Sequence, residues 1–438
     1  MGEWRRSSRR PVRSGAVRAG ACAVLVAATL AACSSTTSST SGGSGSTQPP
    51  VPSSAFADHT GVTADSVTVG NVSTLVAGLF KGAAVGTEAY AAYVNSQGGV
   101  HGRKLVVRSS DDAFQGATNK QLTSAALGQD FALVGSVSLE DGFGGSVLKA
   151  APGFPNVSES LDSTTEALPN SFSALPAGKG WPLGPLEYFK ATYPTKIAHT
   201  GTIIADLPST EVAWNQEKAT MEHLGYHVLY DPALPPSQTD FTQQVVAMKN
   251  AGVQILFLEQ EPENYASAIF KDLTQQDFHP TVVLGAPSYN ETLVANSGGP
   301  AAVDGAYLEQ AASLYLGEDA AQIPAVGTFD TWVHQVDPGF TPDYFTLLGW
   351  LSTELFTQAL RNAGTDPSRG SLLQALRRIT SFSSGRLAPV TNPAGKVPTN
   401  CFLLGQLVDG RFQRLDNPPV DGPTGGFRCD RPYYVPSS

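Results

Sequence analysis

The run SVTVGNV at residues 66–72 opens the part of the chain that decides the fold. Its valines alternate with small or polar residues, a pattern typical of a β-strand. Two further short strands are predicted at residues 103–109 (RKLVVRS) and 131–135 (FALVG), with helices between the strands at 83–97 and 116–128. This βαβαβ order indicates a parallel sheet covered by helices on both faces.

The alternation of strands and helices begins again after Pro185. The predicted elements are strands at 196–204, 226–230, 254–258 and 281–284, and helices at 209–224 and 241–250. Two successive doubly wound units predict an α/β protein with two lobes. Ligands of such sheets bind outside the carboxyl ends of the strands, so we expect a site where these ends line a cleft between the lobes.

Composition indicates a packed and acidic protein. The chain has 438 residues, of which 41% are hydrophobic and 15% charged, and this length is too great for a single ordinary core. The formal charge is −10; residues 1–32 carry six Arg and one Glu, a net of +5, so the remainder has a charge of −15. Phosphate backbones repel such a surface, which argues against nucleic-acid binding.

The first 32 residues are predicted to be an export signal. An Arg-rich start precedes an uncharged apolar run at residues 19–32, which is shorter than the roughly 20 residues needed to cross a bilayer. The run ends in LAAC, residues 30–33, which resembles the lipobox of bacterial lipoproteins. That resemblance implies diacylation of Cys33 and a lipid-anchored protein on the extracytoplasmic face of the cell membrane. The alternative is an ordinary signal peptide in which Cys33 has no role; the Sec or Tat route stays open.

Residues 33–62 are predicted to be a flexible tether. The stretch SSTTSSTSGGSGSTQPP at 34–50 contains no apolar side chain other than proline, so it cannot bury apolar surface. Such a tether lets the globular part reach a partner in the membrane.

The remaining cysteines predict one disulfide. Cys22 lies in the signal and Cys33 in the lipobox, which leaves Cys401 and Cys429. An even pair in an oxidising compartment favours a disulfide between them. Two reduced thiols, or a metal site, are the alternatives.

Residues 95–105, NSQGGVHGRKL, are similar to the helix stop and tight turn of the branched-chain amino-acid-binding (Leu/Ile/Val) type of periplasmic binding protein. In that family an acidic pair follows, here Asp111-Asp112. Thr239-Asp240-Phe241, where Thr239 or Asp240 is the expected N-cap, and the C-terminal run with Cys401, Asp409-Gly410 and Cys429 are further matches. The resemblance covers about residues 64–430.

The resemblance implies the type I fold of this family, with two doubly wound parallel-sheet lobes joined by a three-crossover hinge. By position, lobe 1 is expected to comprise residues 63–176 and 311–383, and lobe 2 residues 177–310 and 384–438. The lobes of such proteins close on a solute by hinge motion.

By position in the family, loops of both lobes supply the ligand contacts. The expected residues are Phe80, Ser138, Ser158 and Ser160 from lobe 1, and Asp206, Glu259 and Tyr289 from lobe 2. Hydroxyl and N–H groups suit a carboxylate, and an acid suits an ammonium or hydroxyl group. The alternatives are helix caps for the Ser and Asp residues, core packing for Phe80 and a solvated rim for Glu259.

The chain departs from leucine-type members at two ligand positions. Those members have an acid after the strand that ends here at Leu284, where this chain has Gly285. Many amino-acid binders also have an aromatic residue after the first strand of the second lobe, where this chain has Ala205-Asp206. Amides, small carboxylates and aromatic acids therefore stay open beside amino acids.

No catalytic motif is present. The chain lacks a G-x-S-x-G elbow and a phosphate loop, and Gly225 between His223 and His227 argues against a helical metal pair. We expect no enzyme activity, no cofactor and no metal. The expected function is that of a monomeric solute-binding protein that serves the permease and ATPase of an ABC importer. The alternative is a ligand-sensing subunit of the same fold that signals to a membrane receptor.

Overall fold

The computed structural model describes residues 48–415, 424–429 and 432–435, which belong to one compact unit. The predicted signal peptide and Cys33 lie outside the described residues. In the described part of the chain, no helix combines the length and the apolar character needed to cross a membrane.

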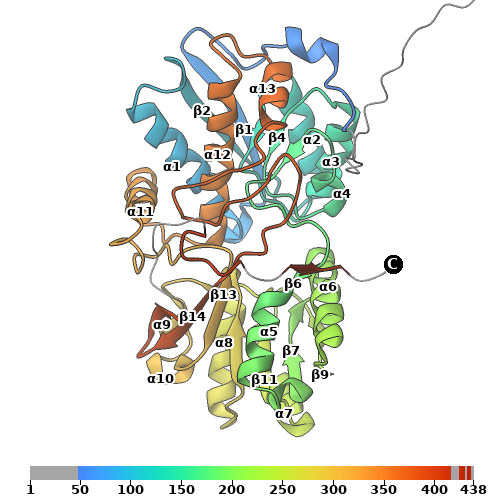
Figure 1. Ribbon diagram of the computed structural model, residues 1–438, viewed down its shortest axis with the longest axis vertical. Helices are drawn as coiled ribbons and strands as arrows, with labels where there is room; N and C mark the ends of the chain where they lie inside the picture. Colours follow the sequence, from blue (N-terminus) through green and yellow to red (C-terminus); the bar gives the residue numbers. More distant parts are fainter. Residues whose placement is uncertain (1–47, 416–423, 430–431, 436–438) are drawn as a thin grey trace, which may run out of the picture. The chain divides into compact units, whose positions relative to one another are not determined.

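The first sheet has five parallel strands in the order β2-β1-β3-β4-β5 (Figure 1). The strands are β1 Ser66–Ser73, β2 Lys104–Asp111, β3 Leu133–Val134, β4 Asn156–Val157 and β5 Ser171–Phe172. The helices of this part are α1 Lys81–Ser96, α2 Gly116–Leu127, α3 Asp141–Ala150, α4 Ser163–Glu166, α11 Pro324–Val336, α12 Tyr344–Asn362 and α13 Arg369–Leu376, with the 3-10 turns η1 Ser53–Ala57 and η2 Val76–Gly78. One face of the sheet packs on α1 and α12, and the other on α2 and α3.

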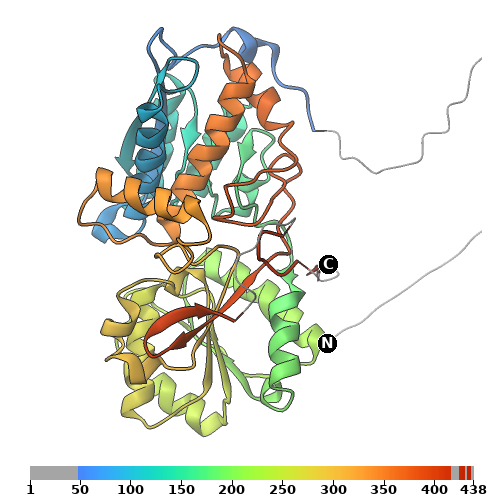
Figure 2. The same ribbon diagram turned by 60° about the vertical axis from the view of Figure 1, so that its left-hand side comes forward.

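The second sheet has seven strands in the order β15-β14-β13-β12-β11-β7-β9. Five are parallel, and β14 and β15 form an antiparallel edge that is visible as the red hairpin in Figure 2. The strands are β7 Thr200–Thr202, β9 Val228–Tyr230, β11 Ile255–Leu258, β12 Thr281–Leu284, β13 Tyr307–Gln310, β14 Leu403–Val408 and β15 Arg411–Arg414.

Helices cover both faces of the second sheet as well. They are α5 Leu183–Thr192, α6 Pro208–Leu224, α7 Thr242–Ala251, α8 Glu263–Gln275, α9 Leu293–Asn296 and α10 Pro300–Val303, with the 3-10 turns η3 Lys196–His199 and η4 Ala286–Ser288. Apolar side chains of α5 and α6 pack on one face, and those of α7 and α8 on the other. Two short pairs, β8 Ile204–Ala205 with β10 Ala233–Leu234 and β6 Trp181–Pro182 with β16 Tyr433–Tyr434, complete the fold.

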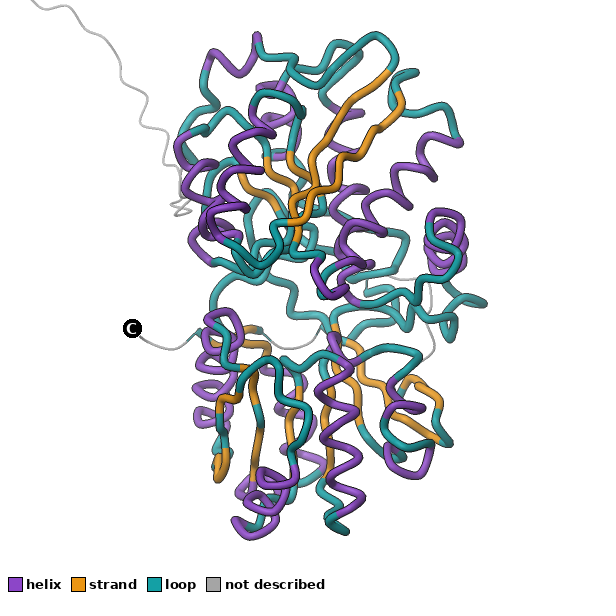
Figure 3. The backbone as a smooth tube through the Cα atoms, turned by 180° about the vertical axis from the view of Figure 1, so that it is seen from behind, coloured by secondary structure: helices purple, strands orange, loops and turns teal. Residues whose placement is uncertain are grey.

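The chain passes between the two sheets three times, after β5, after β13 and after α13. Loops, drawn in teal in Figure 3, make up much of these crossings. The strand order and the three crossings confirm the predicted type I architecture. The predicted lobe boundaries stay a prediction.

Most predicted elements are present, and three differ. The strand expected at 196–204 begins as the turn η3, so only β7 and β8 are extended there. The strand expected at 131–135 shrinks to β3, although Phe131 still donates its N–H to Thr68. The N-cap of α7 is Phe241 rather than Thr239 or Asp240; the Asp240 carboxylate accepts the N–H of Thr242 instead.

The tether is shorter than predicted, because residues 48–62 pack onto the globular part. Ala55 in η1 is 3% exposed. Asp58 forms an ion pair of 2.6 Å with Arg369, whose own side chain is almost fully buried. The rest of the predicted tether, residues 33–47, lies outside the described residues.

The predicted disulfide between Cys401 and Cys429 is present. It joins residues 28 apart in the sequence, directly before β14 and before β16. Closing a loop of this length restricts the unfolded chain, which stabilises a folded protein by roughly 3–4 kcal/mol in the chain-entropy view.

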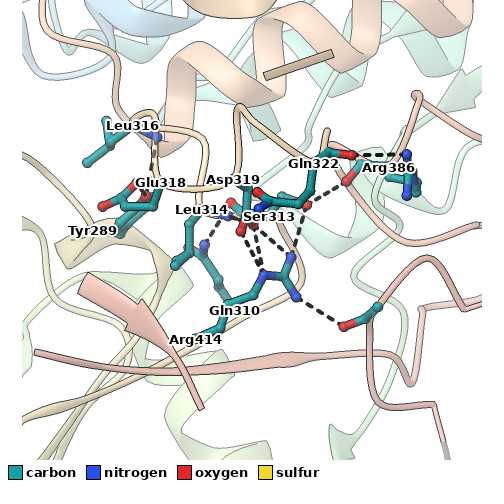
Figure 4. A network of polar contacts seen from close by, with 11 residues as sticks. Tyr289, Gln310, Ser313, Leu314, Leu316, Glu318, Asp319, Gln322, Arg386 and Arg414 are labelled. Atoms are coloured by element: carbon teal, nitrogen blue, oxygen red, sulfur yellow. Dashed lines mark hydrogen bonds and ion pairs between the residues drawn. The ribbon is translucent and has the colours of Figure 1, made fainter. Parts of the chain in front are cut away.

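A buried polar network joins the edge strand β15 to two of the crossings (Figure 4). Arg414 of β15 forms an ion pair of 2.7 Å with Asp319, and both side chains are less than a tenth exposed. Arg414 also donates to the carbonyl of Gly426 at 3.0 Å. Ser313 donates its hydroxyl to the carbonyl of Arg386, which links the second crossing to the third.

Replacing Arg414 with Met should strongly destabilise the protein, because the Asp319 carboxylate then stays buried without its cation. The expected loss is roughly 3–5 kcal/mol in the free energy of unfolding, measured by urea titration. The double variant Arg414→Met/Asp319→Leu removes both charges and should recover most of that loss. A single variant as stable as the parent would show that the ion pair contributes nothing.

Candidate functional site

Both sheets have the same strand order. In each sheet this order places a topological switch point, where ligands of such sheets bind, at the carboxyl edge. Along the chain the five parallel strands of each sheet follow the order 2-1-3-4-5. The connections therefore leave the first and third strands in opposite directions, which opens a crevice beyond their carboxyl ends. In the first sheet these strands are β1 and β3, and in the second they are β7 and β11.

At the first sheet, serine side chains tie the loops of the carboxyl edge to one another. Ser73 Oγ accepts the N–H of Val137 at 3.0 Å, and Ser158 Oγ accepts the N–H of Ser136 at 3.1 Å. Ser138 Oγ donates to the buried Asp112 carboxylate. Ser138 and Ser158 therefore already have hydrogen-bond partners that hold the loops in place.

The loops enclose a cavity of about 30 Å³ that includes Ser136, Ser158 and Ser160 in its wall. This volume is enough for a water molecule but not for an organic solute. Gly135 allows the loop after β3 to lie directly against α1, because a Cβ at this position would be 2.0 Å from the Thr87 hydroxyl. Ser160 is 8% exposed. Solute binding at this edge would require the neighbouring loops to move apart.

Of the other predicted contact residues, Phe80 packs beside the serine loops in a cluster with Val137 and Leu161, whereas Tyr289 and Asp206 belong to the part of the chain with the second sheet. Phe80 is 5% exposed and its ring packs on Phe345, with centroids 4.5 Å apart. Tyr289 is fully buried and donates its hydroxyl to Glu318 at 2.5 Å. Asp206 is exposed, and its N–H pairs with Leu234. As ligand contacts all three stay predictions.

Glu259 follows β11 directly, at the crevice of the second sheet. Its side chain is 6% exposed, so it is not the solvated rim considered as an alternative. No N–H or hydroxyl group of the described residues donates to either carboxyl oxygen, and the Glu309 carboxyl lies within hydrogen-bond distance. Burial raises its pKa well above the usual value, and the charges of Glu217 and Glu309 raise it further.

The sequence alone did not indicate Glu217 or Glu309. Glu217 lies inside α6, 1% exposed, and burial raises its pKa to about 8. Glu309 lies in β13, and burial raises its pKa to about 7. An acid in a helix or a strand carries no sequence signal of a site; only the packing of α6 on the sheet places Glu217 beside Glu259.

Tyr344, the first residue of α12, is influenced by acidic groups from both sheets. Burial raises the pKa of its hydroxyl, and the charges of Glu159, Tyr433 and Glu309 raise it further. Glu159 follows β4 in the first sheet, whereas Glu309 belongs to the second. Acidic groups from the carboxyl edges of both sheets therefore act on one aromatic side chain.

A wider hollow lies elsewhere. It measures about 560 Å³ and is lined by the end of α8, by α10 and by the amino ends of β12 and β13. It is a shallow groove on the side of the sheet opposite to the carboxyl edge. Since solutes of parallel sheets bind at carboxyl ends, we do not assign the solute site to this groove.

The buried acids predict that the ligand-free protein is most stable at mildly acidic pH. A carboxyl group with a raised pKa in the folded state keeps its proton there, so stability is lost as pH rises from the unfolded value towards the folded one. For Glu217, Glu261 and Glu309 this window runs from about 4.5 to about 7 or 8. The thermal midpoint should therefore fall between about pH 5 and pH 8.

Glu217→Gln/Glu259→Gln is the matched variant for this pH series. Its thermal midpoint should change less between pH 5 and pH 8, because two groups that bind protons on folding are absent. Parallel pH profiles of variant and parent would contradict the placement of these two carboxyls in a buried site.

Comparison with known proteins agrees with this architecture. The periplasmic binding protein family matches residues 67–411, which is more than half of the chain. A comparison with curated protein sequences gives no match.

Several solved structures share the fold. A branched-chain amino acid ABC transporter protein from Thermus thermophilus with bound valine is 14% identical, with a TM-score of 0.69 over 82% of this chain and 97% of that one. A fatty acid ABC transporter substrate-binding protein from Thermomonospora curvata is 15% identical, with a TM-score of 0.66 over 86% and 94%. A solute-binding protein from R. palustris in complex with benzoate is 18% identical, with a TM-score of 0.64 over 85% and 98%.

The family match extends over both sheets, from β1 into β15, and the shared strand order explains why the carboxyl edges carry the polar loops. These observations agree with the expectation that the chain binds a solute rather than catalyses a reaction. The chain belongs to the periplasmic binding protein family.

Proposed function

We propose that the chain captures a small polar solute outside the cytoplasmic membrane and delivers it to the permease of an ABC importer. The observation that carries this proposal is the family match over two sheets whose carboxyl edges bear buried polar groups, serines on the first and Glu259 on the second. The partner ATPase hydrolyses ATP. A lipid on Cys33 anchors the protein, and residues 33–47 form its tether.

The solute contacts groups from both carboxyl edges. On the first sheet these are Ser158 and Ser160 beside the loop after β3, and on the second Glu259 beside β11. Contacts with both edges favour a closed arrangement, because a ligand shifts a conformational equilibrium only through its different affinity for the two states.

The solute class is an amino acid or a related amide or carboxylate. The structures with the same fold include proteins described with valine and with benzoate, and one described as a fatty acid binder. A single fold thus accommodates chemically different solutes, and the residues at the carboxyl edges decide among them.

Thermal-shift screening of the full chain tests the proposal. The panel comprises amino acids, amides, small carboxylates, fatty and aromatic acids, amines and sugars. A solute at 100 times its Kd stabilises the folded state by about 2.7 kcal/mol, which gives a clear rise in the thermal midpoint. Isothermal titration should then give one site per chain.

Ser160→Trp is the matched control, because an indole at this edge fills the space that the solute would occupy. The variant should lose the thermal shift. Because Ser160 is 8% exposed, a urea titration of the solute-free variant checks separately that it still folds. A panel without any hit, or a hit that Ser160→Trp leaves unchanged, would contradict capture at the carboxyl edges.

A further inference from the structure

Three glutamates gather on one face of the second sheet, at its carboxyl end. The register pairs Leu258 with Leu284 and Leu284 with Leu308, so the next residues along the strands, Glu259, Gly285 and Glu309, form a row. Side chains two residues apart in a strand point to the same face. Glu259 and Glu309 therefore lie on the face of Phe257 and Tyr307, which α5 and α6 cover.

The middle of this row has no side chain. A Cβ at Gly285 would lie 2.1 Å from the backbone oxygen of Glu259, so only glycine fits there. The backbone of Glu259 lies directly against Gly285, and the side chains of Glu259 and Glu309 reach each other across it within hydrogen-bond distance. Glu217 approaches from α6, where Gln260 donates to its carboxylate at 3.4 Å.

No positively charged side chain of the described residues balances these three carboxyl groups. Apart from the contact with the Glu309 carboxyl, no donor in the described part of the chain reaches either oxygen of Glu259, and one oxygen of Glu217 is buried without a hydrogen-bond partner. The side chains of Glu259 and Glu217 are only 6% and 1% exposed. Among the described residues, no Lys, Arg or His forms an ion pair with any of the three glutamates or contributes to their pKa shifts. Buried acids of this kind destabilise a fold unless a cation joins them.

A purely structural role does not explain the cluster. Apolar side chains in place of the three acids would continue the core formed by Trp214, Phe257 and Tyr226. Destabilising groups that persist beside a crevice are typical of binding sites. The chemistry of the row is that of a receptor for hydrogen-bond donors that carry positive charge.

We propose that the solute carries an organic cation, an amine or a guanidine, which binds at the carboxyl groups of Glu217, Glu259 and Glu309. This inference rests on the proposed function and specifies its solute class. The cation replaces the protons of the acids, and its N–H groups donate to the oxygens of Glu259 and Glu217.

Isothermal titration of the full chain at pH 8 tests this inference with six probes. Putrescine and agmatine carry cations without a carboxylate, arginine and leucine carry both groups, and benzoate and hexanoate carry only an anion. At least one probe with an amine or guanidine group should bind. Its Kd should tighten as pH rises from about 6 to 8, because the glutamates must lose protons to receive the cation.

Glu259→Gln should weaken binding of that probe roughly 100-fold, since it leaves the cation without its central partner. Glu309→Gln is a second variant in case the first does not fold. Glu261→Gln is the matched control on the same loop, because a glutamine oxygen can still accept the N–H of Ala205, as Glu261 does at 3.0 Å. This control should leave the Kd unchanged.

The outcomes separate the inference from the proposed function. A probe whose Kd is the same in Glu259→Gln and the parent, or binding of benzoate or hexanoate alone, would overturn the cation site and leave solute capture standing. No binding by any cationic probe, with a hit elsewhere in the wider screen, would do the same. A wider screen without a hit would overturn both.

Discussion

The parallel strand order 2-1-3-4-5, present in both sheets, is the constraint on which the rest of the structure depends. All parallel strands of a sheet end at the same edge, so the loops that follow them lie together there. The helices then run back along the two faces of the sheet. The serine ties after β1 and β3, and Glu259 after β11, follow from this order. The edge strands β14 and β15 run antiparallel and contribute the Arg414 network instead.

The buried polar groups of the two carboxyl edges differ in how far their hydrogen bonds are satisfied. At the first sheet the hydroxyl groups of Ser73, Ser138 and Ser158 have partners, and the loops enclose a cavity with room for little more than water. At the second sheet, no N–H or hydroxyl donor of the described residues reaches the Glu259 carboxyl, and one oxygen of Glu217 has no partner. A satisfied network makes an edge rigid, whereas acids without donors make the other edge receptive to a ligand.

The sequence predicted what local patterns determine. Alternating valines predicted β1, and Gly98-Gly99 predicted the end of α1. The even pair Cys401 and Cys429 predicted the disulfide. Tertiary packing determined the rest. Residues 48–62 pack through the buried Ala55 and the Asp58–Arg369 ion pair, which composition does not reveal. Glu259 was a predicted contact, but Glu217 and Glu309 join it only through the register of three strands and the packing of α6.

A crystal structure of the chain with its highest-affinity solute would test the central claim most directly, because the groove at the amino ends of β12 and β13 lies at the opposite end of these strands from their carboxyl edge. The account predicts solute density at the carboxyl edges, in contact with Glu259 and near Ser158 and Ser160. Density confined to the groove of about 560 Å³ at the amino ends of β12 and β13 would contradict it.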